Sequence, residues 1–140
     1  MSKVPTILII EDDPDFCRVL TTFLETEPYR VVTAASGEEG LRKVRQENPD
    51  LIILDVMMEK IITGFEVAHR LKSKDPRSEY AAYAQVPILV LTALHEKTFF
   101  RFEPDEEYLP VEEFMEKPVK REEFLRRVER LLRQRTTAAA

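Results

Sequence analysis

The sequence of 140 residues has a single cysteine, Cys17, so an internal disulfide bond is excluded. No apolar run approaches the roughly 18 residues that a membrane-spanning helix needs. Its 21 basic and 26 acidic residues give a net charge of −5, which argues against a dedicated nucleic-acid surface. Met1-Ser2-Lys3 leads into an apolar segment without a signal-peptide pattern. These absences favour a protein of the reducing cytoplasm, with Cys17 as a small packed residue on a helix.

No internal repeat and no second domain is visible, and 44% apolar residues are enough for a core. We expect one domain over residues 1–135 and a disordered tail over 136–140. No output domain is visible after Arg135. Either the protein acts by binding partners directly, or the sequence is a piece of a longer chain.

Short apolar segments alternate with helical patterns along the chain. Strands are expected over residues 4–10, 29–34, 50–54, 86–91 and 113–116. Asp13-Pro14 predicts the start of a first helix, whose apolar face holds Phe16, Val19, Leu20, Phe23 and Leu24. Ser36 and Glu39 form a capping box for a second helix, which Pro49 ends. Gly64 is expected to be the hinge into a third helix, and the last one should begin near Arg121.

The segment from Ala93 to Glu112 lacks a regular pattern. Pro104 and Pro110 forbid a long helix there, so the fourth helix of the pattern should be shortened or missing, with at most a short helix near 95–102. The aromatic and aliphatic side chains of this segment are Phe99, Phe100, Phe102, Tyr108 and Leu109. They either cover the sheet edge that a helix would cover or form a patch for a partner or a homodimer.

Alternation of strands and helices predicts an α/β protein with a parallel sheet covered on both faces. Five strands with right-handed crossovers favour the flavodoxin-like, doubly wound order 2-1-3-4-5. In that order the first and third strands are neighbours. Glu11 and Asp12 would then face Asp55 across a crevice at the carboxyl edge of the sheet, where open α/β sheets bind ligands.

The residues at the strand ends predict phosphoryl chemistry. Carboxylates that lie close together require a cation or a proton between them, and oxygen ligands at an exposed edge suit Mg²⁺. Thr92 adds a hydroxyl, and Lys117 adds a positive charge for a phosphate. Asp55 can act as a nucleophile that forms an acyl phosphate. Taken singly, the acidic pair, Thr92 and Lys117 have ordinary interpretations as caps or surface charges, so the prediction depends on their conjunction.

The sequence also resembles a known family, the response-regulator receiver domain. The similarity lies in Ile7-Leu8-Ile9-Ile10-Glu11-Asp12-Asp13, Asp50 to Met58, Gly64-Phe65-Glu66-Val67, Leu91-Thr92-Ala93 and Glu116-Lys117-Pro118. The resemblance implies that Asp55 accepts a phosphoryl group from a histidine kinase or a phosphotransfer protein. It implies Mg²⁺ bound by Asp12, Asp55 and the backbone carbonyl of Met57, with Glu11 acting through water.

The same resemblance implies three further roles. Lys117 pairs with the phosphate and precedes a cis peptide to Pro118. Thr92 moves to bond a phosphoryl oxygen. Phe114, at the aromatic switch position, reports the change through packing alone because it lacks a hydroxyl. A downstream partner then reads the surface of the fourth and fifth strands and the last helix.

The sequence departs from the family at several places. Glu59 stands where the family commonly has proline, and the connection over residues 74–85 is long. Met57 and Leu94, which flank the path of the hydrolytic water in the family, are apolar, so the acyl phosphate should be long-lived. We expect no enzymatic activity beyond phosphorylation and slow dephosphorylation at Asp55.

Two alternatives differ in class. A haloacid-dehalogenase-like enzyme would also place a nucleophilic aspartate after a strand, but it needs a second acid at the position of Met57. The other alternative is a pseudo-receiver, a binding module that works without phosphorylation; the intact set of acids, threonine and lysine argues against it.

Overall fold

A computed structural model of the chain describes residues 4–55, 61–92 and 111–139. Its helices are α1 (Pro14–Glu25), α2 (Gly37–Glu47), α3 (Ile61–Leu71) and α4 (Arg121–Ala139), with a short 3₁₀ helix, η1 (Ala81–Tyr83). Its strands are β1 (Thr6–Ile10), β2 (Arg30–Ala34), β3 (Leu51–Asp55), β4 (Ile88–Thr92) and β5 (Glu113–Glu116). All pair in parallel in the order β2-β1-β3-β4-β5, which confirms the flavodoxin-like prediction.

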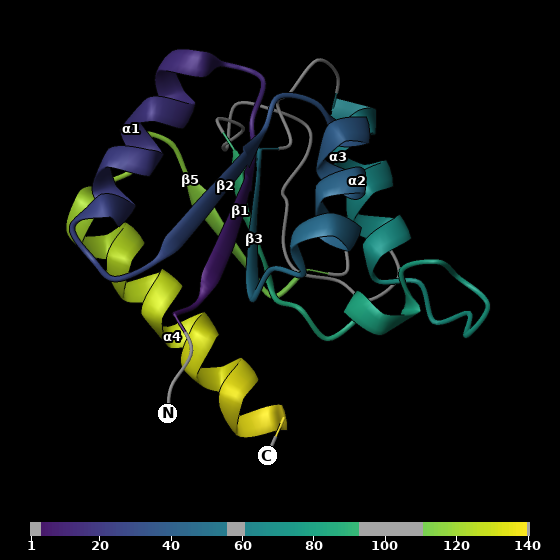
Figure 1. The fold of residues 1–140 in the computed structure, drawn as a ribbon. Coiled ribbons are helices and arrows are strands. Elements are labelled where there is room, and N and C mark those ends of the chain that lie inside the picture. The colour runs from purple at the N-terminus through teal and green to yellow at the C-terminus, as the bar shows by residue number, and fades with distance from the viewer. Residues whose placement is uncertain (1–3, 56–60, 93–110, 140) are drawn as a thin grey trace.

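The sheet is the middle of three layers, with α1 and α4 on one face and α2 and α3 on the other (Figure 1). Successive side chains of a strand point to opposite faces. Ile7 and Ile9 of β1 therefore pack under α1 and α4, whereas Leu8 and Ile10 pack under α2 and α3. The central strands β1, β3 and β4 are buried along their whole length, as continuous aliphatic runs predict.

Local signals fix the starts of the first two helices as the sequence predicts. The Asp13 carboxylate accepts hydrogen bonds from the backbone N–H groups of Asp15 and Phe16, and Pro14 occupies the first helical position. Ser36 Oγ accepts from the N–H of Glu39 at 3.1 Å. The Glu39 carboxylate reaches back to the N–H of Ala35, one residue before the one that a capping box would use.

Three expectations about helices differ from the structure. Val19 was expected on the apolar face of α1, yet it is 43% exposed. It lies on the flank of a face centred on Leu20 and Leu24. The third helix begins at Ile61 rather than at Gly64, because no proline or cap interrupts the turn before the glycine. Helix α4 continues to Ala139, past the predicted end at Arg135, through residues without glycine or proline.

The connection from α3 to β4 contains η1 and is anchored by one buried lysine. The Lys72 side chain is only 8% exposed. Its ammonium donates to the carbonyls of Ala84 and Val86 and to the Glu112 carboxylate, at 3.0, 2.8 and 2.8 Å. The expectations for residues 93–110, including a shortened or missing fourth helix, fall outside the described residues.

Candidate functional site

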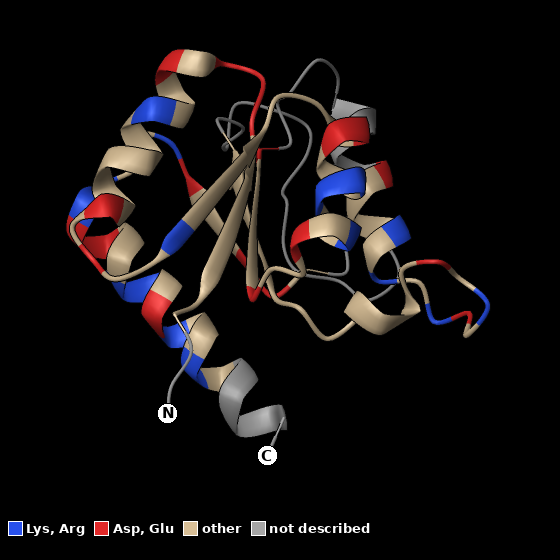
Figure 2. Cartoon of the chain, viewed as in Figure 1, with Lys and Arg blue, Asp and Glu red and all other residues tan. Residues whose placement is uncertain are grey.

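The carboxyl edge of the sheet brings together polar residues from the ends of four strands. Each is held by its backbone: the N–H of Glu11 donates to Ala34 O at 2.9 Å, and the N–H of Lys117 donates to Thr92 O at 2.8 Å. Asp55 ends β3 and lies in register with Leu91 of β4. Figure 2 shows the acidic connection from β1 to α1 beside this edge, at the top of the view. The sheet itself therefore fixes where these side chains begin.

Three carboxylates form a compact cluster at this edge. One oxygen each of Glu11, Asp12 and Asp55 lies within 4.8 Å of the others. Glu11 and Asp55 are each 3% exposed, whereas Asp12 is open to solvent. The cluster thus has two buried members and one that faces water, as a site approached from outside would require.

Among these three carboxylates, Glu11 has both an unpartnered oxygen and a raised pKa. Its Oε2 accepts a hydrogen bond from the N–H of Asp13 at 3.0 Å, but its buried Oε1 has no hydrogen-bond partner among the described residues. Burial raises the pKa of Glu11 from 4.5 to about 8, and the neighbouring Asp55 carboxyl adds to the rise. The Asp13 N–H and the Lys117 charge oppose it. A pKa of about 8 favours the protonated form of Glu11 at neutral pH in the absence of a metal, and the protonated carboxyl can donate a hydrogen bond to Asp55.

Lys117 supplies the positive charge of the site. Its Nζ lies 2.9 Å from Asp55 Oδ2 and 3.9 Å from Glu11 Oε1, and the side chain is 23% exposed. The peptide bond to Pro118 is cis, as the family resemblance implies. Thr92 is 3% exposed at the end of β4, on the strand between those of Asp55 and Lys117. The predicted acids, hydroxyl and ammonium are therefore all at one edge.

The donor set fits a hard divalent cation. Carboxylate oxygens are the ligands that Mg²⁺ prefers, and it needs only one or two of them because it keeps several waters. The unpartnered Oε1 of Glu11 is the kind of buried atom that a bound ion or its water would satisfy. Met57, whose carbonyl the resemblance adds to this set, lies outside the described residues.

Phe114 of β5 is half-buried and packs against the core on the α2 and α3 side of the sheet. Helix α4 is joined to this strand by arginines. Arg127 donates to Glu113 Oε1 at 2.8 Å and to the Phe114 carbonyl at 2.9 Å, and Arg130 also pairs with Glu113. These contacts join the backbone of Phe114 and the side chain of Glu113 to α4.

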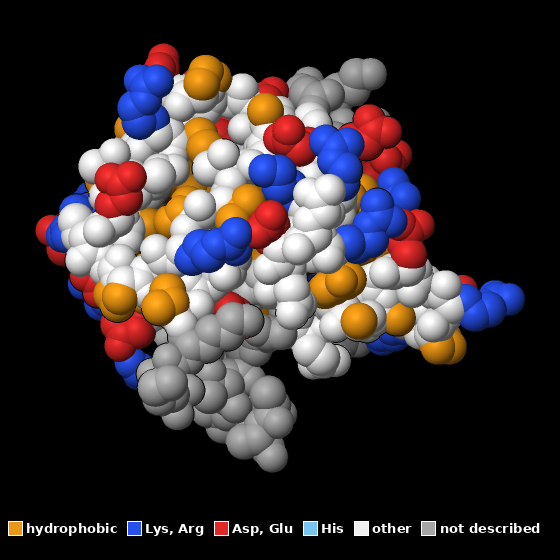
Figure 3. Space-filling model, in the orientation of Figure 1, with side chains coloured by type: hydrophobic (Ala, Val, Ile, Leu, Met, Phe, Trp, Pro, Cys, Tyr) orange, Lys and Arg blue, Asp and Glu red, His pale blue; other side chains and the backbone are white. Residues whose placement is uncertain are grey.

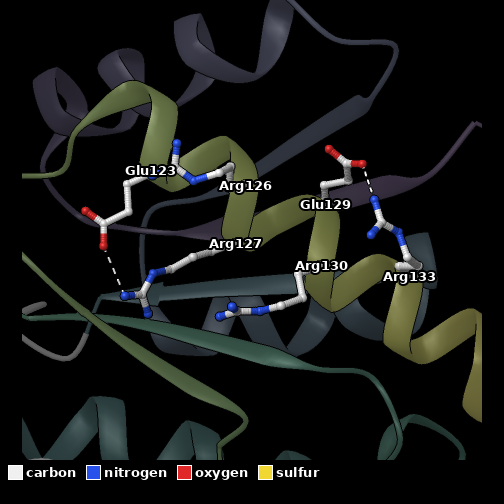
Figure 4. A pocket seen from close by; sticks show the side chains of 6 residues that line it. All are labelled: Glu123, Arg126, Arg127, Glu129, Arg130 and Arg133. Atoms are coloured by element: carbon white, nitrogen blue, oxygen red, sulfur yellow. Dashed lines mark hydrogen bonds and ion pairs between the residues drawn. The ribbon is translucent and has the colours of Figure 1, made fainter.

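A charged groove of about 470 Å³ lies along the outer side of α4. It is lined by Glu123, Arg126, Arg127, Glu129, Arg130 and Arg133, which Figure 4 shows projecting from successive turns. Arg126 makes no hydrogen bond or ion pair within the described residues. The groove therefore presents excess positive charge next to β5. On the face shown in Figure 3, by contrast, acidic and basic side chains are interspersed.

One contact at the site was not predicted from the sequence. The ring of Phe16, on the first turn of α1, lies with its centroid 4.3 Å from Lys117 Nζ. The sequence assigned Phe16 only to the apolar face of the helix. Its position four residues after Asp12 at the start of the helix was the available signal, because the first turn of α1 borders the acidic edge.

A five-stranded parallel sheet in this order, with an acidic cluster and a lysine at its carboxyl edge, belongs to the flavodoxin-like class, whose ligands bind at that edge. The family described as response regulator receiver domain matches residues 7–129, and the chain belongs to that family. Receiver domains are the phosphoacceptor modules of two-component response regulators and bind Mg²⁺ in an acidic pocket; the cluster of Glu11, Asp12 and Asp55 could hold such an ion.

Individual relatives agree with this assignment. The transcriptional regulatory protein AfsQ1 of Streptomyces coelicolor is 44% identical over 90 residues, which are 64% of this chain and 36% of that protein. The alkaline phosphatase synthesis transcriptional regulatory protein PhoP of Bacillus subtilis is 35% identical over 140 residues, covering 95% of this chain and 50% of that one. The chain thus spans half or less of these curated relatives.

Among solved structures, the chemotaxis response regulator CheY4 of Vibrio cholerae matches with a TM-score of 0.73 and 26% identity, over 92% of this chain and 99% of that one. Within the described ranges, no helix combines the length and the apolar character needed to cross a membrane.

Proposed function

We propose that Asp55 accepts a phosphoryl group from the phosphohistidine of a histidine kinase or a phosphotransfer protein, and that the resulting acyl phosphate changes a partner-binding surface. The observation that carries this proposal is the pair of Asp55 Oδ2 and Lys117 Nζ, 2.9 Å apart beside two further carboxylates. An ammonium in contact with the attacking carboxylate is positioned to follow the incoming negative charge.

The chemistry balances within this site. An oxygen of the Asp55 carboxylate attacks phosphorus, the bond from phosphorus to the donor imidazole breaks, and the imidazole leaves with a proton from solvent. Asp12, Asp55 and the Met57 carbonyl would hold Mg²⁺, with Glu11 acting through a water. When bound, that ion supplies positive charge against the phosphoryl oxygens. Lys117 and the Thr92 hydroxyl then bind those oxygens.

The contacts of α4 support a route from the site to a surface. Lys117 directly follows β5, and the arginines of α4 hold Glu113 and the Phe114 carbonyl of the same strand. A shift of Lys117 and Thr92 toward a phosphoryl group would bias the packing of Phe114 and the position of α4. The surface of β4, β5 and α4, including its arginine-lined groove, is then read by a downstream protein or by a second copy of the chain.

The expected setting is the cytoplasm, with no membrane and no direct nucleic-acid contact for the region described. Activity beyond phosphorylation and slow dephosphorylation at Asp55 is not proposed. A pseudo-receiver that binds partners without phosphorylation is the remaining alternative, and the Asp55–Lys117 pair argues against it, because a binding module has no need of a buried carboxylate cluster that raises the pKa of Glu11.

Intact-mass spectrometry after incubation with Mg²⁺ and acetyl phosphate tests the proposal. One phosphoryl adduct is expected on the wild-type protein. It should be absent in Asp55→Asn and after chelation of Mg²⁺, and retained in Asp15→Asn, which removes an exposed carboxylate of α1. An unmodified wild type would favour the pseudo-receiver, and an adduct that survives in Asp55→Asn would overturn Asp55 as the acceptor.

A further inference from the structure

Among the described residues, the Lys117 ammonium lies beside two carboxylates and one aromatic ring. The first two are Asp55 Oδ2 at 2.9 Å and Glu11 Oε1 at 3.9 Å. The third is the face of the Phe16 ring, whose centroid lies 4.3 Å from Nζ. An ammonium within about 6 Å of an aromatic centroid is attracted by the negative charge of the ring face. The ring is thus an electrostatic partner of the lysine as well as a packing surface.

Phe16 is held in place from both of its ends. Its backbone N–H donates to the Asp13 carboxylate at 3.4 Å, at the cap of α1. Its half-buried side chain packs against the core formed by α1, α4 and the sheet. The backbone of Phe16 is therefore attached to the cap of α1, and its ring rests against the core beside Lys117. Lys117, in contrast, bears its charge on a flexible stem of four carbons and is 23% exposed.

Phosphorylation requires Lys117 to change acceptors. In the unmodified protein its charge points at Asp55. During transfer the same charge must turn to the phosphoryl oxygens while it remains at the edge of the sheet. A carboxylate partner would compete with those oxygens for the N–H donors. An aromatic face attracts the charge without demanding a particular donor direction, so it can hold the ammonium in both arrangements.

We propose that Phe16 is a positioning residue for phosphoryl transfer, whose ring keeps the Lys117 ammonium at the edge of the site while it passes from Asp55 to the phosphoryl group. This inference rests on the proposed function, since it assigns a role within that reaction. The simpler interpretation is that Phe16 only fills the space between α1 and the sheet. The two differ in what a leucine does at this position, because leucine retains apolar bulk but has no charged ring face.

The kinetic test compares Phe16→Leu, Phe16→Tyr and Phe23→Leu at saturating Mg²⁺ and increasing acetyl phosphate. Phe23 is a matched control: it is also half-buried on α1, and its ring packs on Phe124 at 6.1 Å, in the core below the site. Phe16→Leu should lower the maximal phosphorylation rate about three- to tenfold with little change in the Mg²⁺ concentration required. Phe16→Tyr should restore the rate, and Phe23→Leu should leave it unchanged.

A second readout does not involve phosphorylation. Methylene protons of a lysine held over a ring face are shifted upfield by the ring current. In protein labelled with ¹³C-lysine, the Lys117 ε-methylene signal, assigned with Lys117→Arg, should lie upfield in the wild type and in Phe16→Tyr. It should return to the ordinary lysine position in Phe16→Leu.

The outcomes separate this inference from the proposed function. Normal phosphorylation of the wild type with an unchanged rate in Phe16→Leu, or an unshifted Lys117 signal in the wild type, would overturn the role of Phe16 and leave the acceptor role of Asp55 intact. An equal loss of rate in Phe16→Leu and Phe23→Leu would also overturn it, in favour of packing. Failure of the wild type to accept a phosphoryl group would overturn both.

Discussion

The two edges of the sheet each hold a lysine against acidic side chains, one against Glu112 and the other against Glu11 and Asp55, but the hydrogen bonds of the two ammonium groups differ. At the amino edge, the three N–H donors of Lys72 meet three acceptors at 2.8–3.0 Å: the carbonyls of Ala84 and Val86 and the Glu112 carboxylate. Glu112 also accepts the N–H of Ile88 at 2.8 Å. That edge is saturated with hydrogen bonds.

At the carboxyl edge, a buried carboxylate oxygen has no hydrogen-bond partner among the described residues. Lys117 donates to Asp55, lies 3.9 Å from Glu11 and faces an aromatic ring, while Glu11 Oε1 has no hydrogen-bond partner among the described residues. Two buried carboxylates share one ammonium. Saturated networks stabilise a fold, whereas polar groups left partly unsatisfied are reserved for a ligand. The amino edge, with Lys72, thus stabilises the domain, whereas the carboxyl edge, with Lys117, is the site of the proposed phosphoryl transfer.

The largest expected effect is on the lifetime of the acyl phosphate at Asp55. In the family, the positions of Met57 and Leu94, which both lie outside the described residues, flank the path of the hydrolytic water. Because both side chains are apolar, we predict that the acyl phosphate is long-lived. Met57→Gln adds a group that can orient water and should shorten the lifetime by roughly tenfold or more. Decay of the mass adduct after removal of the donor measures both lifetimes, and a wild-type lifetime of seconds would contradict the prediction.

Removing the Lys72 ammonium from the amino edge should lower the free energy of unfolding without preventing phosphorylation of Asp55. Lys72→Met removes the lysine donor from two backbone carbonyls and leaves the Glu112 carboxylate with the N–H of Ile88 alone, and carbonyls cannot escape this cost by taking up a proton. We expect a loss of about 2–3 kcal/mol in the free energy of unfolding by urea. The folded variant should still form the Asp55 adduct.

Lys120→Met is the control for that experiment, since Lys120 is exposed and lies after β5 on the way to α4. Its free energy of unfolding should stay within about 0.5 kcal/mol of wild type. Equal losses in the two variants would mean that the Lys72 network contributes nothing in particular.

The crowding of carboxylates at the carboxyl edge should make the free energy of unfolding depend on pH. In chelator, the pKa of Glu11 is about 8 in the folded protein and near 4.5 when unfolded. The folded state therefore binds more protons, and stability is lost as pH rises from about 5 to about 8. Glu11→Gln does not titrate, so its stability relative to wild type should grow by about 3–4 kcal/mol over that range. A constant difference between the two proteins would contradict the raised pKa.

The smallest effect is expected for Lys117→Met. At the carboxyl edge, a proton can replace the lost positive charge of the lysine, because the raised pKa of Glu11 favours its protonated form at neutral pH and that carboxyl can donate to Asp55. The backbone carbonyls at the amino edge cannot be protonated in this way. The free energy of unfolding in chelator should fall by about 1 kcal/mol or less, well below the loss in Lys72→Met. Equal losses at the two edges would remove the distinction drawn between them.

Patterns along the sequence predicted the sheet order, the helix starts at Asp13 and Ser36, and the position of the acidic cluster. These depend on neighbouring residues and on one topological rule: the carboxyl ends of parallel strands meet at one edge. The start of α3 was predicted wrongly because no proline or cap interrupts the turn before Gly64. The flank position of Val19 was predicted wrongly because packing against the sheet decides which side chains of a helix are buried.

The sequence by itself determined which chemical groups this domain has and on which edge they lie, since strand alternation and chain order are enough for that. Only the tertiary structure decided how those groups are satisfied. The 62-residue separation of Asp55 from Lys117, the ring of Phe16 over that lysine and the three acceptors around Lys72 join distant segments. Hydrogen bonds and burial act over a few ångströms in space, and no spacing along the chain specifies those distances.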